Sequence, residues 1–332
     1  MRVQSHHPLN VVITDSNFQS NEPERNVLEK AGLRVTQFHC RTVEELKEAG
    51  KDADAALVQF APVTGEVLKA WDRCQIIVRY GIGYDNVDIR AAEELGIQVC
   101  NVPSYCLDEV ADHTCALILA SLRKIVPFHE SVKRGEWDVE KIARPMKSFA
   151  DTTIGLLGFG RIGRNVCRRL VPFGFRLMVY DPYMKPGAEN EFGAVRAESL
   201  RTILGESDVV TLHLPLSQET RHLIDEATLR LMKPGAVLVN TSRGGLVDTV
   251  ALARALRENA IGFAALDVFE EEPLPPDHPL RACGNVLFTP HAAFYSDVSL
   301  LRLQQQAAEE IVRWFSGEPL SSPVNRPRKP RR

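Results

Sequence analysis

The sequence predicts an α/β protein of two domains, each built around a parallel β-sheet, and three observations lead to this prediction. Short apolar runs alternate with helix-like segments from residue 10 onward. Strands separated by helices need crossover connections, which favour a parallel sheet. A second alternating series begins near residue 151 and contains six strand-like runs. The chain of 332 residues is long enough for two ordinary domains.

The first series predicts five strands and three helices. Glycine follows the helix-like runs 24–31 and 42–49, which is typical of a helix end. A longer helix is expected over 107–124, with acids in its first turn and bases in its last turn. The expected strands are residues 10–15, 34–39, 55–60, 75–80 and 98–101.

The second series follows a polar stretch, 127–150, for which we expect irregular structure. Its strands are expected near Ile154 and Leu177 and over 209–214, 236–240, 263–268 and 286–288. A final helix, expected over 297–315, comes after this series and can return to the first domain. The second domain is therefore predicted to be inserted into the first. The expected domains are 1–104 with 295–332, and 105–294, and a basic, proline-rich tail over 320–332 is expected to be disordered.

Charge and cysteine content narrow the class of protein. There are 40 basic and 43 acidic residues, so no overall basic field favours nucleic acid or an anionic membrane as partner. The seven cysteines form no CxxC pair, which argues against a metal site and for a reducing compartment. No apolar run is long enough for a membrane span or a signal peptide. We therefore expect a cytoplasmic protein.

A glycine-rich loop, Gly158-Phe159-Gly160-Arg161-Ile162-Gly163, is the most informative motif of the chain. It follows the strand-like run 153–157 and opens the helix-like run 161–170. The next strand-like run ends at Asp181, 18 residues after the last glycine. This strand–loop–helix–strand–acid unit is that of a Rossmann-like dinucleotide site. A structural turn without a ligand is the alternative.

Each part of this unit has a physical role in such a site. Gly158 permits the tight turn, Gly160 lets a pyrophosphate approach the backbone, and Gly163 lets the helix pack close to the strand. Free N–H groups and the helix dipole favour phosphate at the helix start. Asp181 would accept hydrogen bonds from the adenosine ribose and repel a 2′-phosphate, so NAD is predicted rather than NADP.

Three side chains that directly follow predicted strands are candidates for chemistry. Hydride transfer to a keto carbon needs a proton donor for the carbonyl oxygen and a cation for the carboxylate and carbonyl. Arg243 offers a planar guanidinium fork, and His291 and Glu272 form a possible acid–base pair, because a carboxylate orients an imidazole and favours its charged form. A turn ion pair, a loop histidine and a solvated glutamate are the respective structural alternatives.

The chain resembles the D-isomer-specific 2-hydroxyacid dehydrogenase family over about residues 10–318. The matching stretches are the glycine-rich loop, 78–88 (VRYGIGYDNVD), 239–248 (VNTSRGGLVD), 265–273 (ALDVFEEEP) and 289–293 (TPHAA). The resemblance implies that Arg243 binds substrate, that Glu272 and His291 are the acid–base pair, and that backbone N–H groups near Ile82 and Gly83 hold the substrate carboxylate. The predicted cofactor contacts are Thr114, Gly158, Gly160, Arg161, Ile162, Gly163, Asp181, Pro215, Thr220, Thr241, Asp267 and His291.

Within this family the chain is most similar to the C-terminal-binding-protein branch. The similarity rests on 78–79, 100–103 (CNVP), 180–183 (YDPY) and 292–296 (AAFYS), although Phe294 stands where that branch typically has tryptophan. We therefore predict an NAD-dependent oxidoreductase of D-2-hydroxy acids and 2-oxo acids. The alternative is an NAD(H)-sensing regulatory protein of the C-terminal-binding-protein kind.

A homodimer is predicted from the segment 107–146. Its apolar positions are more numerous than one helix face of a monomer would need to bury, and the family resemblance places the twofold interface there. These positions are Cys115, Ile118, Leu119, Leu122, Ile125, Val126 and Phe128.

Overall fold

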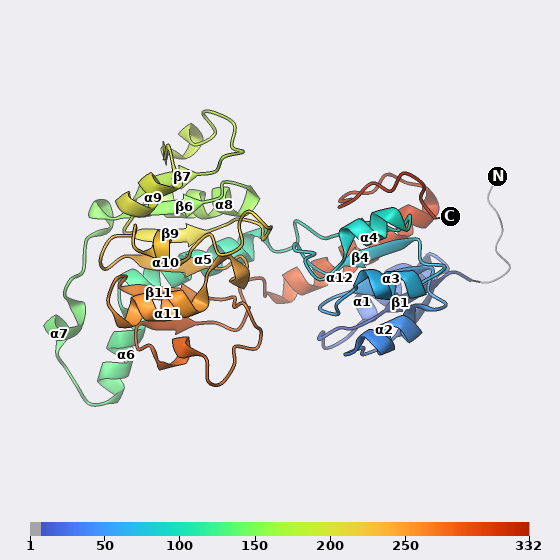
Figure 1. Ribbon diagram of the computed structural model, residues 1–332, viewed down its shortest axis with the longest axis horizontal. Coiled ribbons are helices and arrows are strands. Elements are labelled where there is room, and N and C mark those ends of the chain that lie inside the picture. Colours follow the sequence, from blue (N-terminus) through green and yellow to red (C-terminus); the bar gives the residue numbers. More distant parts are fainter. Residues whose placement is uncertain (1–7, 332) are drawn as a thin grey trace. The chain divides into compact units, whose positions relative to one another are not determined.

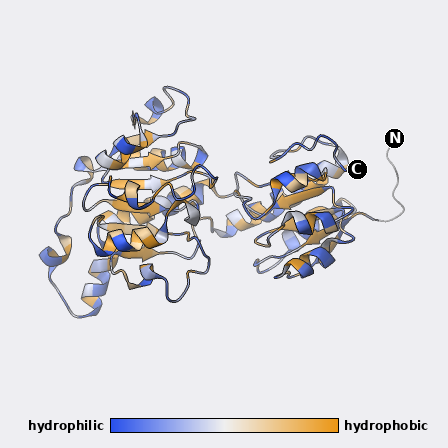
Figure 2. Ribbon diagram, viewed as in Figure 1, coloured by the Kyte–Doolittle hydropathy of each residue, from blue (hydrophilic) through white to orange (hydrophobic). Residues whose placement is uncertain are grey.

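The computed structural model describes residues 8–331 and divides them into two compact units (Figure 1). Unit 1 contains the described residues up to Cys106 and those from Ser296 onward, and unit 2 is Leu107–Tyr295. Each unit has one sheet whose strands are all parallel, so the predicted α/β class with two parallel sheets is confirmed. Figure 2 shows the strands of both sheets as the most hydrophobic elements, as expected for sheets covered by helices.

The strands of unit 1 lie in the order β2-β1-β3-β4-β5, the flavodoxin-like order. Trp71 is fully buried in its core and donates its indole N–H to the carbonyl of Leu46 at 2.8 Å. The elements are β1 (Asn10–Ile13), α1 (Glu22–Lys30), β2 (Arg34–Gln37), α2 (Val43–Gly50), β3 (Ala55–Val58), α3 (Gly65–Ala70), β4 (Ile76–Arg79), α4 (Ile89–Glu94), β5 (Gln98–Cys100) and α12 (Asp297–Ser316).

The C-terminal segment packs against unit 1, so the prediction of a disordered tail is wrong for residues 320–331. Asn325 is only 5% exposed, and its side-chain oxygen accepts the N–H of Val99 at 2.8 Å. The carboxylate of Glu310 accepts the N–H groups of Ser321 and Ser322, each at 2.8 Å. The composition of this segment suggested disorder, but its backbone donors and acceptors are satisfied by the free edge of β5 and by α12.

The strands of unit 2 lie in the order β12-β11-β10-β9-β6-β7-β8, so the chain direction across the sheet reverses between β6 and β9. Ligands of such sheets bind outside the carboxyl ends of the strands at this reversal. The elements are α5 (Leu107–Leu122), α6 (Ile125–Lys133), α7 (Val139–Ala143), η1 (Phe149–Asp151), β6 (Thr153–Leu157), α8 (Arg161–Leu170), η2 (Val171–Phe173), β7 (Arg176–Tyr180), η3 (Asn190–Phe192), β8 (Val195–Arg196), α9 (Leu200–Glu206), β9 (Val209–Leu212), α10 (Glu226–Leu229), β10 (Val237–Asn240), η4 (Gly244–Leu246), α11 (Thr249–Arg257), β11 (Phe263–Leu266), η5 (Pro279–Ala282) and β12 (Val286–Phe288).

The stretch 127–150, expected to be irregular, contains most of α6 and all of α7. Pro127 is the third residue of α6, within the first turn, where an amide N–H would have no helical partner. The helix expected over 107–124 ends at Leu122 because Lys124 adopts a left-handed conformation (φ 50°).

Asp208, which precedes β9, forms hydrogen bonds to residues near the amino ends of the strands in unit 2. Its carboxylate accepts hydrogen bonds from Lys147 at 2.8 Å, from the N–H of Thr153 at 2.9 Å and from Lys233 at 3.2 Å. Burial raises the pKa of Asp208, but these donors outweigh burial and the pKa lies below its usual value. The folded state therefore keeps this carboxylate ionised.

Candidate active site

The glycine-rich loop connects β6 to α8 and has the shape that a dinucleotide cradle requires. Gly158 has a φ of 94°, and a Cβ there would lie 2.5 Å from the carbonyl oxygen of His213. A Cβ on Gly163 would lie 2.3 Å from the carbonyl oxygen of Gly158. By contrast, no atom lies within 4 Å of a Cβ built on Gly160, the residue before α8. Two glycines thus allow tight packing, and the third leaves open space at the helix start, beside Arg161 and Ile162, that fits a phosphate.

Asp181 follows β7 and is fixed to this loop by backbone hydrogen bonds. One carboxylate oxygen accepts the N–H of Phe159 at 2.9 Å, and the other accepts the N–H of Tyr183 at 2.8 Å. Each carboxylate oxygen can accept a further hydrogen bond. The acid is therefore held in one orientation next to the loop and can still accept from a ribose hydroxyl.

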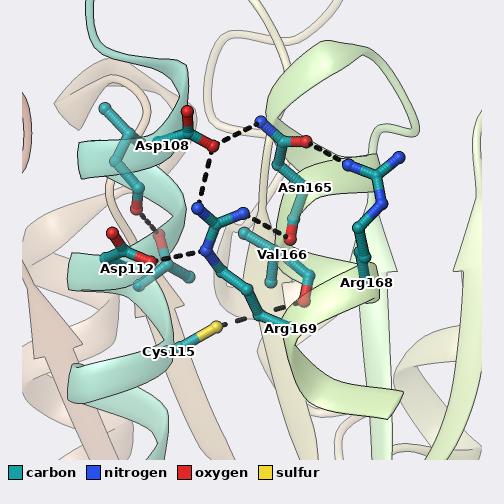
Figure 3. Close-up of polar contacts among 9 residues, drawn as sticks. Asp108, Asp112, Cys115, Asn165, Val166, Arg168 and Arg169 are labelled. Carbon is teal, nitrogen blue, oxygen red and sulfur yellow. Dashed lines mark hydrogen bonds and ion pairs between the residues drawn. The ribbon is translucent and has the colours of Figure 1, made fainter. Parts of the chain in front are cut away.

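Helix α5 is joined to α8 by a cluster of charged side chains (Figure 3). Arg169 of α8 contacts the carboxylates of Asp108 and Asp112, which lie four residues apart on one side of α5. Its guanidinium is 2.8 Å from Asp108 Oδ1. In the same contact the thiol of Cys115 lies against the carbonyl of Val166. This contact fixes α5 next to the helix that opens at the glycine-rich loop.

Thr114 of α5 and Thr241, which follows β10, meet inside unit 2. Both side chains are buried, and their hydroxyl oxygens lie 2.7 Å apart. In the loop after β9, Thr220 donates its hydroxyl to the carbonyl of Pro215 at 2.7 Å. The structure therefore places Thr114 beside one predicted cofactor residue and joins two others in the loop after β9.

His291 and Glu272 form a direct pair, although they come from loops after different strands. His291 Nδ1 lies 2.7 Å from Glu272 Oε2, and Glu272 Oε1 accepts the N–H of Phe269 at 2.9 Å. Burial raises the pKa of Glu272, but the hydrogen bond and charge of His291, the Phe269 N–H and the charge of Arg243 together lower it below its usual range. Because Nδ1 faces the carboxylate, Nε2 is the ring nitrogen available to a substrate.

Arg243 follows β10 and lies beside the loop that carries Glu272. A Cβ on the next residue, Gly244, would lie 1.8 Å from the carbonyl carbon of Phe269. Only glycine allows these two loops to touch, and the touch brings Arg243 close enough to affect the pKa of Glu272. The structure thus brings together all three residues predicted for chemistry.

Asp267, which follows β11, is completely buried and holds the turn that carries His291. Its carboxylate accepts the N–H groups of Ala292 at 2.8 Å and Ala293 at 3.0 Å, and the hydroxyl of Thr289 at 2.5 Å. The backbone carbonyl of Asp267 accepts the N–H of His291 at 2.7 Å. The backbone of His291 adopts the left-handed conformation, with a φ of 51°. In this structure Asp267 therefore orients the His291 turn, and its predicted contact with the cofactor stays a prediction.

His113, which the sequence analysis did not single out, extends this network. Its Nε2 lies 3.1 Å from Thr289 Oγ1. Thr289 donates its hydroxyl to Asp267 Oδ1, so its oxygen is left to accept from His113 Nε2–H. The only sequence signal was the place of His113 next to Thr114 on α5.

Ile82 and Gly83 belong to unit 1, directly after β4. The carbonyl of Ile82 accepts the side-chain amide of Asn101 at 2.6 Å, and Gly81 before it has a φ of 137°. The loop is thus fixed from within unit 1, and both residues are partly exposed. Their contact with a substrate carboxylate stays a prediction.

Residues 8–331 contain neither a candidate membrane span nor a candidate metal site. No helix in this part of the chain combines the length and apolar character of a membrane span. No group of three or more His, Cys, Asp or Glu side chains in it is arranged to hold a metal ion.

The part of the chain that contains this site is similar to proteins of known family. Residues 115–293 match the family described as "D-isomer specific 2-hydroxyacid dehydrogenase, NAD binding domain". The chain is 42% identical over 289 residues to a glyoxylate reductase of Aeropyrum pernix, covering 85% of this chain and 86% of the relative.

Two solved structures have the same fold over nearly the whole chain. A D-lactate dehydrogenase of Aquifex aeolicus in complex with NAD and lactic acid matches with a TM-score of 0.83 and 32% identity, covering 93% of this chain and 96% of that one. An NADPH-dependent glyoxylate/hydroxypyruvate reductase of Sinorhizobium meliloti, in complex with NADP and malonate, matches with a TM-score of 0.84 and 28% identity, covering 98% and 99%. These relatives are named as enzymes, which favours the enzyme over the NAD(H)-sensing alternative. The resemblance to the C-terminal-binding-protein branch stays a prediction.

Proposed function

The chain belongs to the D-isomer specific 2-hydroxyacid dehydrogenase family, and we propose that it reduces a small 2-oxo acid of the glyoxylate type with NADH. The predicted nicotinamide-dependent interconversion of hydroxy acids and oxo acids is confirmed by the family match and the relatives. The proposal that the chain reduces a small 2-oxo acid with NADH rests on one observation. His291 and Glu272 form a pair at 2.7 Å beside Arg243. It lies in the unit that also carries the dinucleotide loop.

The proposed mechanism gives each residue of the site one task. When bound, the nicotinamide supplies the hydride for reduction and accepts it in the reverse direction. His291, as imidazolium, donates the proton on Nε2 to the carbonyl oxygen of the substrate. Glu272 stabilises the imidazolium and keeps the ring oriented. Arg243 polarises the carbonyl and binds the carboxylate.

We assign NAD binding to unit 2, because residues 115–293, which match the NAD-binding domain of the family, lie within it. We assign substrate binding to unit 1, whose contribution is the loop of Ile82 and Gly83. For the cofactor we propose NAD rather than NADP, since Asp181 is fixed beside the glycine-rich loop by two backbone N–H groups and its charge would repel a 2′-phosphate. Pyrophosphate would bind at the open helix start beside Gly160.

The proposal is tested with a panel of 2-oxo acids. Glyoxylate and hydroxypyruvate, with pyruvate and a branched-chain 2-oxo acid for comparison, are mixed with NADH and the protein, and NADH absorbance is followed. We expect turnover with at least one small 2-oxo acid and its loss in His291→Asn. If the protein binds NADH but reduces none of these acids, the proposed substrate class is wrong.

We also propose a homodimer, with its interface on the α6–α7 part of the predicted segment 107–146. Cys115 and Ile118 lie in the core of unit 2, with Ile118 completely buried, so neither is available to a partner and the earlier expectation for them is wrong. Large apolar side chains of the α6–α7 segment are instead exposed to solvent: Ile125 (56%), Val126 (38%), Val132 (54%), Trp137 (86%) and Val139 (60%). A second copy would cover an apolar surface of this kind.

We propose a cytoplasmic location from the state of the cysteine thiols. All seven have free thiols and are buried. Burial raises the pKa of the Cys74 thiol to about 12, which keeps it protonated and unreactive. Free thiols throughout are typical of a reducing compartment.

A further inference from the structure

A second carboxylate, Glu270, lies two residues before Glu272 on the same loop and is held by two different elements. Its Oε2 accepts the backbone N–H of Thr249, the first residue of α11, at 3.0 Å and the hydroxyl of Thr249 at 2.6 Å. Its Oε1 lies 2.5 Å from His222 Nε2. The Glu270 side chain is 27% exposed, and its contacts with Thr249 are partly buried, whereas its contact with His222 lies at the surface.

The direction of the hydrogen bonds around Glu270 follows from its charge. Burial raises the pKa of Glu270, but the bonds from Thr249 and His222 outweigh burial and lower it, so the carboxylate is ionised. An ionised carboxylate only accepts, so Thr249 donates its hydroxyl. His278 Nε2, 3.2 Å from the same hydroxyl oxygen, is then the donor, because His278 Nδ1 accepts the N–H of Leu280 at 3.2 Å.

The same contacts join the loop of Glu272 to the loop of Arg243. The N–H of His222 donates to the carbonyl of Gly245 at 2.8 Å. Gly245 follows Gly244, whose backbone touches that of Phe269 and Glu270. A closed ring of contacts therefore runs from Glu270 through His222 and Gly245 to Gly244 and back to Phe269.

We propose that Glu270, with His222 as its partner, is a positioning residue that aims the Glu272 carboxylate at His291. Glu272 is set by its own backbone, because one of its oxygens accepts the N–H of Phe269. Phe269 is in turn fixed between Gly244 and the anchored Glu270. Loss of the anchor lets this loop move, and the His291–Glu272 distance of 2.7 Å is no longer maintained. Glu270 contacts neither substrate nor cofactor in this scheme. The inference rests on the proposed roles of Glu272 and His291.

The test compares Glu270→Gln with Glu271→Gln as matched control, because Glu271 lies on the same loop with an exposed side chain. In Glu270→Gln we expect kcat to fall about 10- to 100-fold, the range for a small displacement of a catalytic group. The affinity for NADH, measured by fluorescence, should change less than about twofold. Because Glu272 stabilises the imidazolium form of His291 in the proposed mechanism, Glu272→Gln should lower the pH at which reduction has lost half its activity. Glu270→Gln should shift this pH in the same direction, and Glu271→Gln should behave as the parent.

A double-mutant cycle separates positioning from a general loss of structure. If Glu270 acts through Glu272, the Glu270→Gln/Glu272→Gln double variant has nearly the kcat and pH profile of Glu272→Gln alone. Multiplicative effects, or a Glu270→Gln variant with the kcat and pH profile of the control, overturn the inference. Should Glu270→Gln fail to fold, His222→Gln replaces it in the same cycle, since it leaves the Thr249 contacts in place. An active His291→Asn variant would refute the proposed function; an inactive one together with a normal Glu270→Gln refutes only this inference.

Discussion

Asp181 offers the sharpest test of the cofactor site. We expect the protein to use NADH with a kcat/KM at least about tenfold above that for NADPH, a difference of about 1.4 kcal/mol. The carboxylate cannot turn away from a 2′-phosphate, because the N–H groups of Phe159 and Tyr183 hold both of its oxygens. Repulsion between them is therefore not relieved by a change of rotamer.

The magnitude of this repulsion can be worked out from Coulomb's law. A 2′-phosphate carries a charge of about −2, and the repulsion is evaluated for a separation of about 5 Å between the phosphate and the carboxylate. The repulsion is then about 1.7 kcal/mol in bulk water and about 6.6 kcal/mol at an effective dielectric constant of about 20. The lower figure already exceeds the free-energy difference of about 1.4 kcal/mol that corresponds to a tenfold preference. The loss of ribose hydrogen bonds to a charged acceptor adds about 1.5–3 kcal/mol.

Two variants separate charge from hydrogen bonding. Asp181→Asn removes the charge and keeps the shape, so NADPH should improve and the preference should fall to within a few-fold. Asp181→Ala should also weaken NADH, because it removes the ribose acceptor. The assay is kcat/KM for both cofactors at saturating 2-oxo acid. Equal values for the two cofactors in the parent, or an unchanged preference in Asp181→Asn, would refute the reasoning.

Three further predictions address the catalytic pair, stability and assembly. His291→Asn should lower kcat by roughly 10²–10⁴ with NADH affinity nearly unchanged, because the amide cannot titrate; near-normal turnover would show that another group carries the proton. Asp208 has a folded pKa below its usual value of 3.8, so its contribution to stability is present above that pH and is lost as the pH falls through the lower, folded pKa. Asp208→Asn should lower the free energy of unfolding by about 1–3 kcal/mol near neutral pH and by much less in acid, as measured by urea unfolding; an equal loss at both pH values would contradict this. Light scattering of the parent should give a mass near twice 37.0 kDa. The mass of Val132→Asp should fall towards that of one chain, whereas the mass of the control Val195→Asp, also at an exposed position, should not. A monomeric parent would exclude the dimer.

The sequence was sufficient for features that depend on local pattern and on the ends of strands. Arg243, Glu272 and His291 were recognisable because each follows a predicted strand, and parallel strands bring their carboxyl ends to one edge. The glycine-rich loop was recognisable because its glycines and Asp181 have fixed spacing. The strand β8 was missed, since its two exposed residues give no hydrophobic pattern.

Features that depend on distant contacts could not be predicted in the same way. His113 meets Thr289 across 176 residues, and Asn325 meets Gln98 across 227. No local pattern marks either pair. Ile118 illustrates a related problem. An apolar residue on a helix can be covered by its own domain or by a second copy of the chain, and the sequence does not distinguish the two. In the structure Ile118 is buried within its own domain.

The orientation of the His291–Glu272 pair is therefore divided between two anchors. Asp267 holds the turn of His291 and is linked to His113 of α5 through Thr289. Glu270 holds the loop of Glu272 and is linked to α11. Asp267 and Glu270 lie three residues apart on the segment after β11, but their carboxylates bind different elements, so we expect a substitution in either one to displace mainly one partner of the pair. The bond between His291 and Glu272 can thus be lost without any change in the two residues that form it.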